Sequence, residues 1–246
     1  MKFNGDFIGD NTVSDIVKWT GGDSQVQYQT NVVTQSDDWY YKARPITYSF
    51  NSLGHRSKEI EDLNKENYIL FLGCSHTMGV GLELEKTYPH IISQQLDCDY
   101  YNMGLPASGI DVLEYNLLMW FAKVNIAPKA VVIQWPDHSR FASYIPANAK
   151  DHLIERGSWA KDDSTEKFII SSEISGLAHA RKLLTMKIVQ SVVKVPLIQC
   201  IFTSQPIFSI YDLQLRQIDR ARDLSHAGIK SHQAWSELLI GELSKA

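Results

Sequence analysis

The sequence has few cysteines, no long apolar run and no strong excess of charge of one sign. Three unevenly spaced cysteines cannot all pair, which argues against a disulfide framework or a zinc site. No apolar run approaches the ~18 residues of a membrane span, and the first residues lack the apolar core of a secretory signal. A net charge of -4 gives no sign of an electrostatic nucleic-acid binder, whose binding face is enriched in Lys and Arg. We expect a cytoplasmic protein, or one released without a signal peptide, with no membrane or nucleic-acid partner.

The composition is that of an ordinary globular protein. The chain has 246 residues, of which 44% are hydrophobic and 21% charged, enough for one large domain or a domain with an appendage. Residues 1–66 are polar, with turn signals at Gly21-Gly22-Asp23 and Asn51-Ser52-Leu53-Gly54 and short β-like runs at 26–28 and 46–50. This pattern predicts an N-terminal extension of short strands and loops packed on a main domain of residues 67–246.

From residue 67 onward, apolar runs typical of buried strands alternate with helical apolar stripes. The predicted strands are 68–72, 99–103, 130–135 and 197–202. The predicted helices begin near Thr87, Ile110 and Leu177, and a last helix has Trp235, Leu238, Leu239 and Leu243 on one side. Residues 147–167 are polar and aperiodic, which indicates an insertion or a long surface loop. Strands alternating with helices predict a three-layer α/β/α fold around a parallel sheet of about five strands.

Two short motifs carry the chemistry. Gly73-Cys74-Ser75-His76 follows the first predicted strand directly, and Asp223-Leu224-Ser225-His226 lies near the C-terminus. Acyl transfer through a serine needs a nucleophile, a base and a carboxylate that orients the base, and these motifs supply all three. Polar or glycine-bearing segments also follow the second and third strands, at Gly104 and at 136–138. The carboxyl ends of parallel strands meet at one sheet edge, so we expect all of these residues to lie together.

Other interpretations of the same residues are available. Ser75 occurs in a sequence common in turns, and Asp223 or His226 could cap the last helix. Asp137, Asp223, His226 and His232 are metal-ligand types, but no His-x-His or His-x-x-x-His pair is present, so the triad is favoured and no metal or cofactor is expected.

Some neighbouring side chains call for their own interpretation. We expect His76 and His232 to be structural, with His232 hydrogen-bonded behind the site. Arg140 is expected to form a salt bridge with Asp137 rather than bind an anionic substrate. Trp159, in the insertion, is the aromatic residue best suited to stack on a carbohydrate.

The motifs resemble those of the SGNH (GDSL-like) hydrolases, over roughly residues 48–243. Gly73-Cys74-Ser75 is similar to the family's first block, the loop 102–109 to its second, Gln134-Trp135-Pro136-Asp137 to its third, and Asp223-Leu224-Ser225-His226 to its last. Residues 51–57 resemble a stretch that precedes the first block in many members. The resemblance implies the flavodoxin-like α/β/α fold of that family.

The resemblance also implies roles. Ser75 would attack an ester carbonyl, His226 would take its proton and Asp223 would orient the imidazole. The backbone N–H of Ser75 and that of a second-block residue would bind the oxyanion; Gly104 is the first choice, with Gly109 and Ala107 as others. Cys74 replaces the family's aspartate, and Pro136 replaces an asparagine donor, for which His138 is a candidate substitute.

The resemblance implies a serine-dependent ester hydrolase that acts through a covalent acyl-enzyme. Its expected substrate is a small acyl ester or an acylated carbohydrate, such as an O-acetylated sugar. Two alternatives remain open. The chain could be a catalytically impaired SGNH-fold protein with a carbohydrate-binding or structural role, for which the replacement at Pro136 argues. It could also be an O-acyltransferase.

Overall fold

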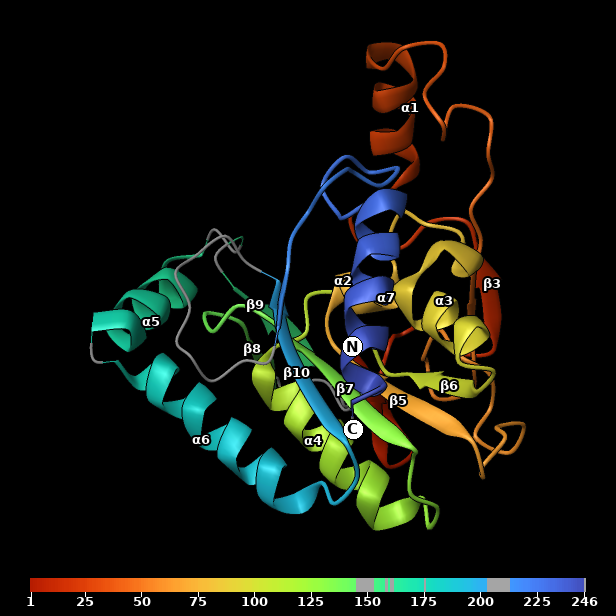
Figure 1. Ribbon diagram of the computed structural model, residues 1–246. Helices are drawn as coiled ribbons and strands as arrows, with labels where there is room; N and C mark the ends of the chain where they lie inside the picture. Colours follow the sequence, from red (N-terminus) through yellow and green to blue (C-terminus); the bar gives the residue numbers. More distant parts are fainter. Residues whose placement is uncertain (145–152, 158, 160–161, 175, 203–212, 246) are drawn as a thin grey trace.

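A five-stranded parallel sheet forms the centre of the computed structural model, which describes residues 1–144, 153–157, 159, 162–174, 176–202 and 213–245 (Figure 1). Its strand order is β11-β10-β7-β5-β6. The strands are β5 (Tyr68–Leu72), β6 (Asp99–Asn102), β7 (Ala130–Trp135), β10 (Leu197–Phe202) and β11 (Leu213–Leu215). All four pairings are parallel. The predicted sheet of about five parallel strands is confirmed.

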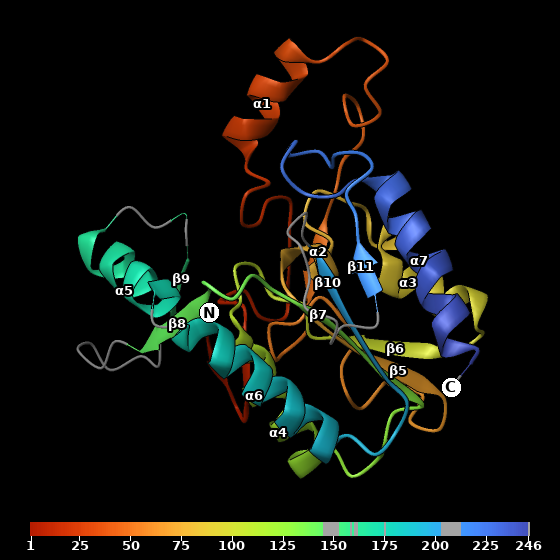
Figure 2. The same cartoon turned by 60° about the vertical axis from the view of Figure 1, so that its left-hand side comes forward.

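Helices cover both faces of this sheet (Figures 1 and 2). One side of the sheet carries α3 (Tyr88–Gln95), α7 (Ile229–Leu243) and the short α2 (Ser75–Met78). The other side carries α4 (Ile110–Lys123), α5 (Asp163–Ile174) and α6 (Leu177–Val192). Alternate strand residues face opposite cores. Leu70 and Leu72 join the core formed with α4 and α6, whereas Ile69 and Phe71 join the core formed with α3 and α7. The predicted three-layer α/β/α fold is therefore present.

Residues 1–66 contain short strands in two antiparallel pairs. The first is β1 (Lys2–Asn4) with β2 (Phe7–Gly9), and the second is β3 (Asp15–Val17) with β4 (Tyr48–Phe50). The β-like reading of residues 26–28 is wrong, because these residues lie in helix α1 (Gln25–Thr34). Ser24 caps this helix by accepting a hydrogen bond from the N–H of Gln27, which satisfies one of the free donors of the first turn.

The polar segment 147–167 is not a single loop. Residues 147–152, 158 and 160–161 lie outside the described residues, but β9 (Leu153–Arg156) pairs with β8 (Phe141–Tyr144) and α5 begins at Asp163. A charged strand on an antiparallel hairpin has no apolar period on which a prediction could rest. Among the described residues, no helix is long and apolar enough to cross a membrane.

Candidate active site

Ser75 lies at the carboxyl edge of the sheet, as the first residue of α2 and directly after the turn that follows β5. Its side chain is almost fully buried, with 6% exposed. The turn is tight because Gly73 has no side chain: a Cβ at this position would lie 1.9 Å from the hydroxyl oxygen of Thr77. Within the described chain, no acceptor binds the backbone N–H of Ser75. This N–H is thus available to a ligand.

Gln134, at the end of β7, holds the turn that carries Ser75. Its Oε1 accepts hydrogen bonds from the thiol of Cys74 at 3.3 Å and from the hydroxyl of Thr77 at 3.2 Å. The Cys74 N–H lies 3.5 Å from the same oxygen. Cys74 therefore has a polar partner in Gln134. Sequence reasoning placed Gln134 in the third block but assigned it no role.

The second block contacts the same turn. The N–H of Leu105 and the hydroxyl of Ser108 both donate to the carbonyl oxygen of Gly73, at 3.1 and 3.2 Å. Gly104 packs against α2, since a Cβ there would lie 2.4 Å from the backbone nitrogen of Met78. The N–H of Gly104 donates to the side-chain oxygen of Asn102 at 2.8 Å. Gly104 thus has a packing role and an occupied N–H.

Ala107 and Gly109, the other second-block candidates, differ from Gly104. Ala107 adopts a left-handed backbone conformation with φ of 59° and is partly exposed. Within the described residues, its N–H has no acceptor. Gly109 precedes α4 and lies so close to the chain after β7 that a Cβ would come within 2.8 Å of the carbonyl oxygen of Arg140. Of the three positions, Ala107 combines an open N–H with partial exposure.

Asp223 and His226 form a hydrogen-bonded pair on one tight turn. The Nδ1 of His226 contacts Oδ2 of Asp223, and Oδ1 of Asp223 accepts from the N–H groups of Ser225 and His226 at 3.1 and 3.0 Å. Leu224, between them, has φ of 59°. The turn is closed by the Ala221 N–H, which donates to the carbonyl oxygen of His226 at 2.9 Å. With Nδ1 bound to the carboxylate, Nε2 is the nitrogen that can accept a proton.

The electrostatics of this pair favour an ionised aspartate. Burial acts to raise the pKa of Asp223, but the hydrogen bond and the charge interaction with His226 outweigh it and lower the pKa overall. Asp223 is 2% exposed. Asp223 does not cap the last helix. Asp219 does so, because its carboxylate accepts from the N–H groups of Lys230 and Ser231 at 3.0 and 2.8 Å.

His76 brings the two motifs into one site. Its ring centroid lies 5.1 Å from that of His226 and 3.9 Å from that of Phe202. The Ala227 N–H, adjacent to His226, points at Nδ1 of His76 at 3.5 Å. No hydrogen bond joins Ser75 to His226 in this structure. The two residues are connected instead by His76, which follows Ser75 in the chain and whose ring packs against that of His226.

The other histidines of the motif regions are buried and neutral. Burial lowers the pKa of His76 well below its usual range and that of His232 to about 3. His232 accepts the N–H of Tyr88, the first residue of α3, at 3.0 Å. It therefore joins α7 to α3 behind the site. Among the described residues, no three His, Cys, Asp or Glu side chains are grouped as metal ligands.

The third block does not supply a side-chain donor at Pro136. The Pro136 carbonyl accepts from Nζ of Lys182 at 3.3 Å, and burial lowers the pKa of that lysine to about 8 although the charge of Asp137 opposes this. The expected salt bridge between Arg140 and Asp137 is not formed. Instead, the Arg140 guanidinium lies over the ring of Trp159, 5.0 Å from its centroid.

His138 lines a separate cavity beside the third block. This cavity has a volume of about 50 Å³ and lies between the start of α4 and helices α5 and α6. Its other lining residues include Arg140, Phe141, Phe168 and Arg181. Neither Ser75 nor His226 lines it. His138 is therefore associated with this cavity.

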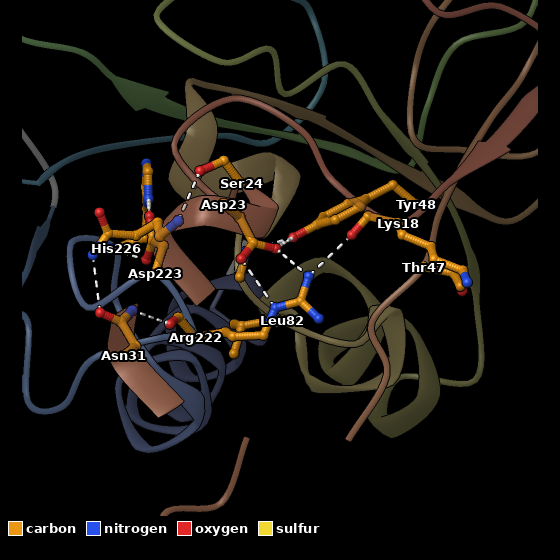
Figure 3. Close-up of polar contacts among 12 residues, drawn as sticks. Lys18, Asp23, Ser24, Asn31, Thr47, Tyr48, Leu82, Arg222, Asp223 and His226 are labelled. Carbon is orange, nitrogen blue, oxygen red and sulfur yellow. Dashed lines mark hydrogen bonds and ion pairs between the residues drawn. The ribbon is translucent and has the colours of Figure 1, made fainter. Parts of the chain in front are cut away.

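A second set of residues at the site comes from the N-terminal 66 residues and was missed by sequence reasoning. Figure 3 shows Asp23 between Arg222 and Tyr48; Asp223 follows Arg222 directly in the chain. The only signal in the sequence was the turn motif at 21–23, which does not identify a partner. Arg222 lies 199 positions away from Asp23, so no local pattern could connect them.

The chain was compared with protein families, curated proteins and solved structures. No protein-family model and no curated protein matches the chain. Among solved structures, it is similar to a carbohydrate esterase family 2 enzyme from Corynascus thermopiles (Myceliophthora fergusii), at 13% identity and TM-score 0.42, over 73% of this chain and 66% of that one.

Two further solved structures are similar to the same extent. An acetyl xylan esterase from the rumen bacterium Butyrivibrio proteoclasticus is 12% identical with TM-score 0.43, over 76% of this chain and 65% of that one. A member of the lipolytic protein G-D-S-L family from Veillonella parvula is 10% identical with TM-score 0.41, over 73% and 99%. The chain spans about two thirds of the length of the two esterases.

Proposed function

We propose that the protein is a serine-dependent ester hydrolase that acts through a covalent acyl-enzyme on Ser75. One observation carries this proposal: buried Asp223 binds Nδ1 of His226 and leaves Nε2 as the basic nitrogen, on a turn next to the Ser75 turn. A buried carboxylate that fixes the imidazole tautomer is the arrangement that a general base for serine requires.

The mechanism follows from these positions. Ser75 Oγ attacks the ester carbonyl and transfers its proton to Nε2 of His226. The imidazolium, stabilised by Asp223, then protonates the leaving alcohol, and Ser75 keeps the acyl group. Water repeats the sequence, giving its proton to His226 and releasing the acid as Ser75 Oγ takes the proton back.

We assign the oxyanion donors to the backbone N–H groups of Ser75 and Ala107. Both are without an acceptor among the described residues, and the loop of Ala107 is bonded to the Ser75 turn through the Gly73 carbonyl. Gly104 is less suited because its N–H already donates to Asn102. Pro136 supplies no donor, so a two-donor site is proposed. Loss of one donor typically lowers the rate by about 100- to 1000-fold, which predicts a slow enzyme.

We propose a small acyl group on a sugar as the substrate, and turnover tests it. The purified protein is given 4-nitrophenyl acetate and an O-acetylated xylo-oligosaccharide, with Ser75→Ala, Asp223→Asn and His226→Ala in parallel. We expect kcat to fall by roughly 1000-fold or more in each variant. Wild-type rates in Ser75→Ala would overturn the proposal. A new sugar ester formed when unacetylated acceptor is added would identify an O-acyltransferase, and the absence of turnover with every ester a catalytically impaired protein.

A further inference from the structure

Residues 15–50 form a strap that leaves the main domain and returns to it. Strands β3 and β4 pair at its base, Asp15 opposite Phe50, and α1 lies at its far end. In Figures 1 and 2, α1 stands beside the loop that precedes α7, the loop that carries Asp223 and His226. Two distant parts of the sequence thus meet at the candidate site.

A buried ion pair joins the strap to this loop. Asp23 is 0% exposed and Arg222 is 2% exposed. Nε of Arg222 donates to Oδ1 of Asp23 at 3.0 Å, and a terminal nitrogen donates to Oδ2 at 2.6 Å, which is a bidentate contact. A pair this deeply buried fixes both backbones, because separating the charges leaves one of them unpaired away from water.

The strap holds Arg222 at several further points. Its guanidinium lies over the rings of Trp19 and Tyr28, 4.4 and 5.3 Å from their centroids, and donates to the carbonyl oxygen of Lys18 at 3.0 Å. The side chain of Asn31, on α1, donates to the Arg222 carbonyl oxygen at 2.9 Å. Both the side chain and the backbone of the residue before Asp223 are therefore fixed by the strap.

The same network reaches the chain that follows Ser75. The hydroxyl of Tyr48 donates to Asp23, and the N–H of Gly81 donates to that hydroxyl at 2.8 Å. The carbonyl of Gly81 in turn accepts the N–H of Arg222 at 3.1 Å. Asp23, Tyr48, Gly81 and Arg222 therefore form a closed ring of hydrogen bonds, which ties the strap to the chain after Ser75 and to the residue before Asp223.

The turn at the start of the strap also lies against the candidate catalytic pair. A methyl group on Gly22 would lie 3.3 Å from Oδ2 of Asp223 and 3.5 Å from Cε1 of His226. A methyl group on Gly21 would lie 3.6 Å from Cβ of Pro106, in the second block. The Gly21-Gly22 turn therefore spans from the second block to His226.

We propose that Asp23 is a positioning residue: through Arg222 it sets the place of Asp223 and His226 relative to Ser75. The strap then takes part in forming the active site, although none of its residues takes part in the reaction itself. The kinetic test of this inference rests on the proposed ester hydrolysis. A displacement of ~1 Å at a reacting group typically lowers the rate about 100-fold.

The first test compares Asp23→Asn with the wild type on 4-nitrophenyl acetate. Asparagine keeps the shape and loses the charge. We expect kcat to fall about 10- to 100-fold with KM within about twofold, because Asp23 fixes the base and does not touch the ester. An unchanged kcat in the folded variant would overturn the inference.

A double variant separates positioning from stability. Asp23→Asn combined with Arg222→Met removes both charges, and replacing a whole buried pair is often neutral for stability. We expect the melting temperature to return toward that of the wild type while kcat stays low. Recovery of kcat together with the melting temperature would show that the pair acts only on folding and would overturn the inference.

Gly22→Ala tests the contact with the pair without breaking an ion pair. The added methyl would lie 3.3 Å from Oδ2 of Asp223, which is closer than most such contacts, so the carboxylate that orients His226 must shift and we expect kcat to fall several-fold. Gly241→Ala is the matched control, because a Cβ at Gly241 meets nothing within 4 Å, and it should keep the wild-type kcat. Equal kcat values for the two variants would contradict the inference.

Amide hydrogen exchange makes the result independent of esterase activity. The N–H groups of Ser225 and His226 both bind Asp223, so they report the order of the turn. We expect both to exchange at least about 10-fold faster in Asp23→Asn, with β5 unchanged. The exchange measurement tests the inference even if the wild type hydrolyses no ester and the proposed function fails. Unchanged exchange in Asp23→Asn would overturn the inference, and faster exchange would support it.

Discussion

At the residue scale, the candidate site combines motif residues with partners that the motifs do not contain. Ser75, Asp223 and His226 could be predicted because each lies in a short pattern with a known chemical logic. Gln134, Asp23 and Arg222 could not, because their contacts join positions far apart in the chain, 57 positions for Thr77 with Gln134 and 199 for Asp23 with Arg222. The sequence favoured Gly104 as the oxyanion donor, but in the structure its N–H already donates a hydrogen bond to the side chain of Asn102.

Gln134→Leu tests how the Ser75 turn is held. This substitution leaves the thiol of Cys74 without its acceptor and the hydroxyl of Thr77 with only Tyr88. We expect a loss of about 1–3 kcal/mol in the free energy of unfolding and slower labelling of Ser75 by an activated phosphonate. Urea unfolding and intact mass measure the two effects.

Cys74→Ala is the comparison for that variant. Gln134 keeps the Thr77 contact, so the labelling rate should stay within about threefold of the wild type, since a thiol is a weak donor. A larger effect for Cys74→Ala than for Gln134→Leu would contradict this view of the turn.

At the element scale, the sheet was predictable and the strap helix was not. β5 and β7 are buried on both faces, and their sequences are almost entirely apolar, which is typical of the buried strands of a parallel sheet. α1 contains valine, threonine and tyrosine, which favour strands. The helix is stabilised by Ser24, which caps its first turn, and by the hydrogen bond from the Asn31 side chain to the Arg222 carbonyl oxygen. The Ser24-x-x-Gln27 spacing is the sequence signal that could have found its start.

Gly104→Ala tests the packing of the second block on α2. The added Cβ would lie 2.4 Å from the backbone nitrogen of Met78 and 2.8 Å from the carbonyl carbon of Thr77. Backbone atoms cannot rotate away, so we expect the free energy of unfolding to fall by about 2–3 kcal/mol. Urea unfolding of Gly241→Ala provides the control, and this helical position should gain about 0.5–1 kcal/mol. Equal stabilities of Gly104→Ala and the wild type would refute this packing role.

At the scale of the whole molecule, two hydrophobic cores pack on the two faces of the sheet, and the fold also buries a set of polar and charged side chains. Three of those groups are neutral histidines. Burial lowers the pKa of His55 to about 4 and of His232 to about 3, and it lowers that of His76 well below 6.5. The fold thus excludes protons that the unfolded chain accepts at mildly acidic pH.

Stability should therefore fall as the pH drops below 6.5. In that range the unfolded chain binds protons at these three histidines and the folded chain does not, so each contributes a loss of about 1.4 kcal/mol per pH unit. Between pH 6.5 and pH 5 we expect about 2 kcal/mol per histidine. Urea unfolding across this range measures the slope.

His232→Asn checks the assignment. Asparagine offers an oxygen to the Tyr88 N–H but takes up no proton, so the slope should become shallower by one histidine's share. The same slope in both proteins would show that His232 does not contribute to it.

The reactivity of Ser75 tests the central claim most directly. The purified protein is treated with a fluorophosphonate probe and its intact mass is measured, with Ser75→Ala and His226→Ala alongside. The proposed mechanism predicts one equivalent of label on the wild type, no label on Ser75→Ala and strongly reduced labelling of His226→Ala. A folded wild-type protein that takes up no label, or Ser75→Ala labelled as fully as the wild type, would contradict it.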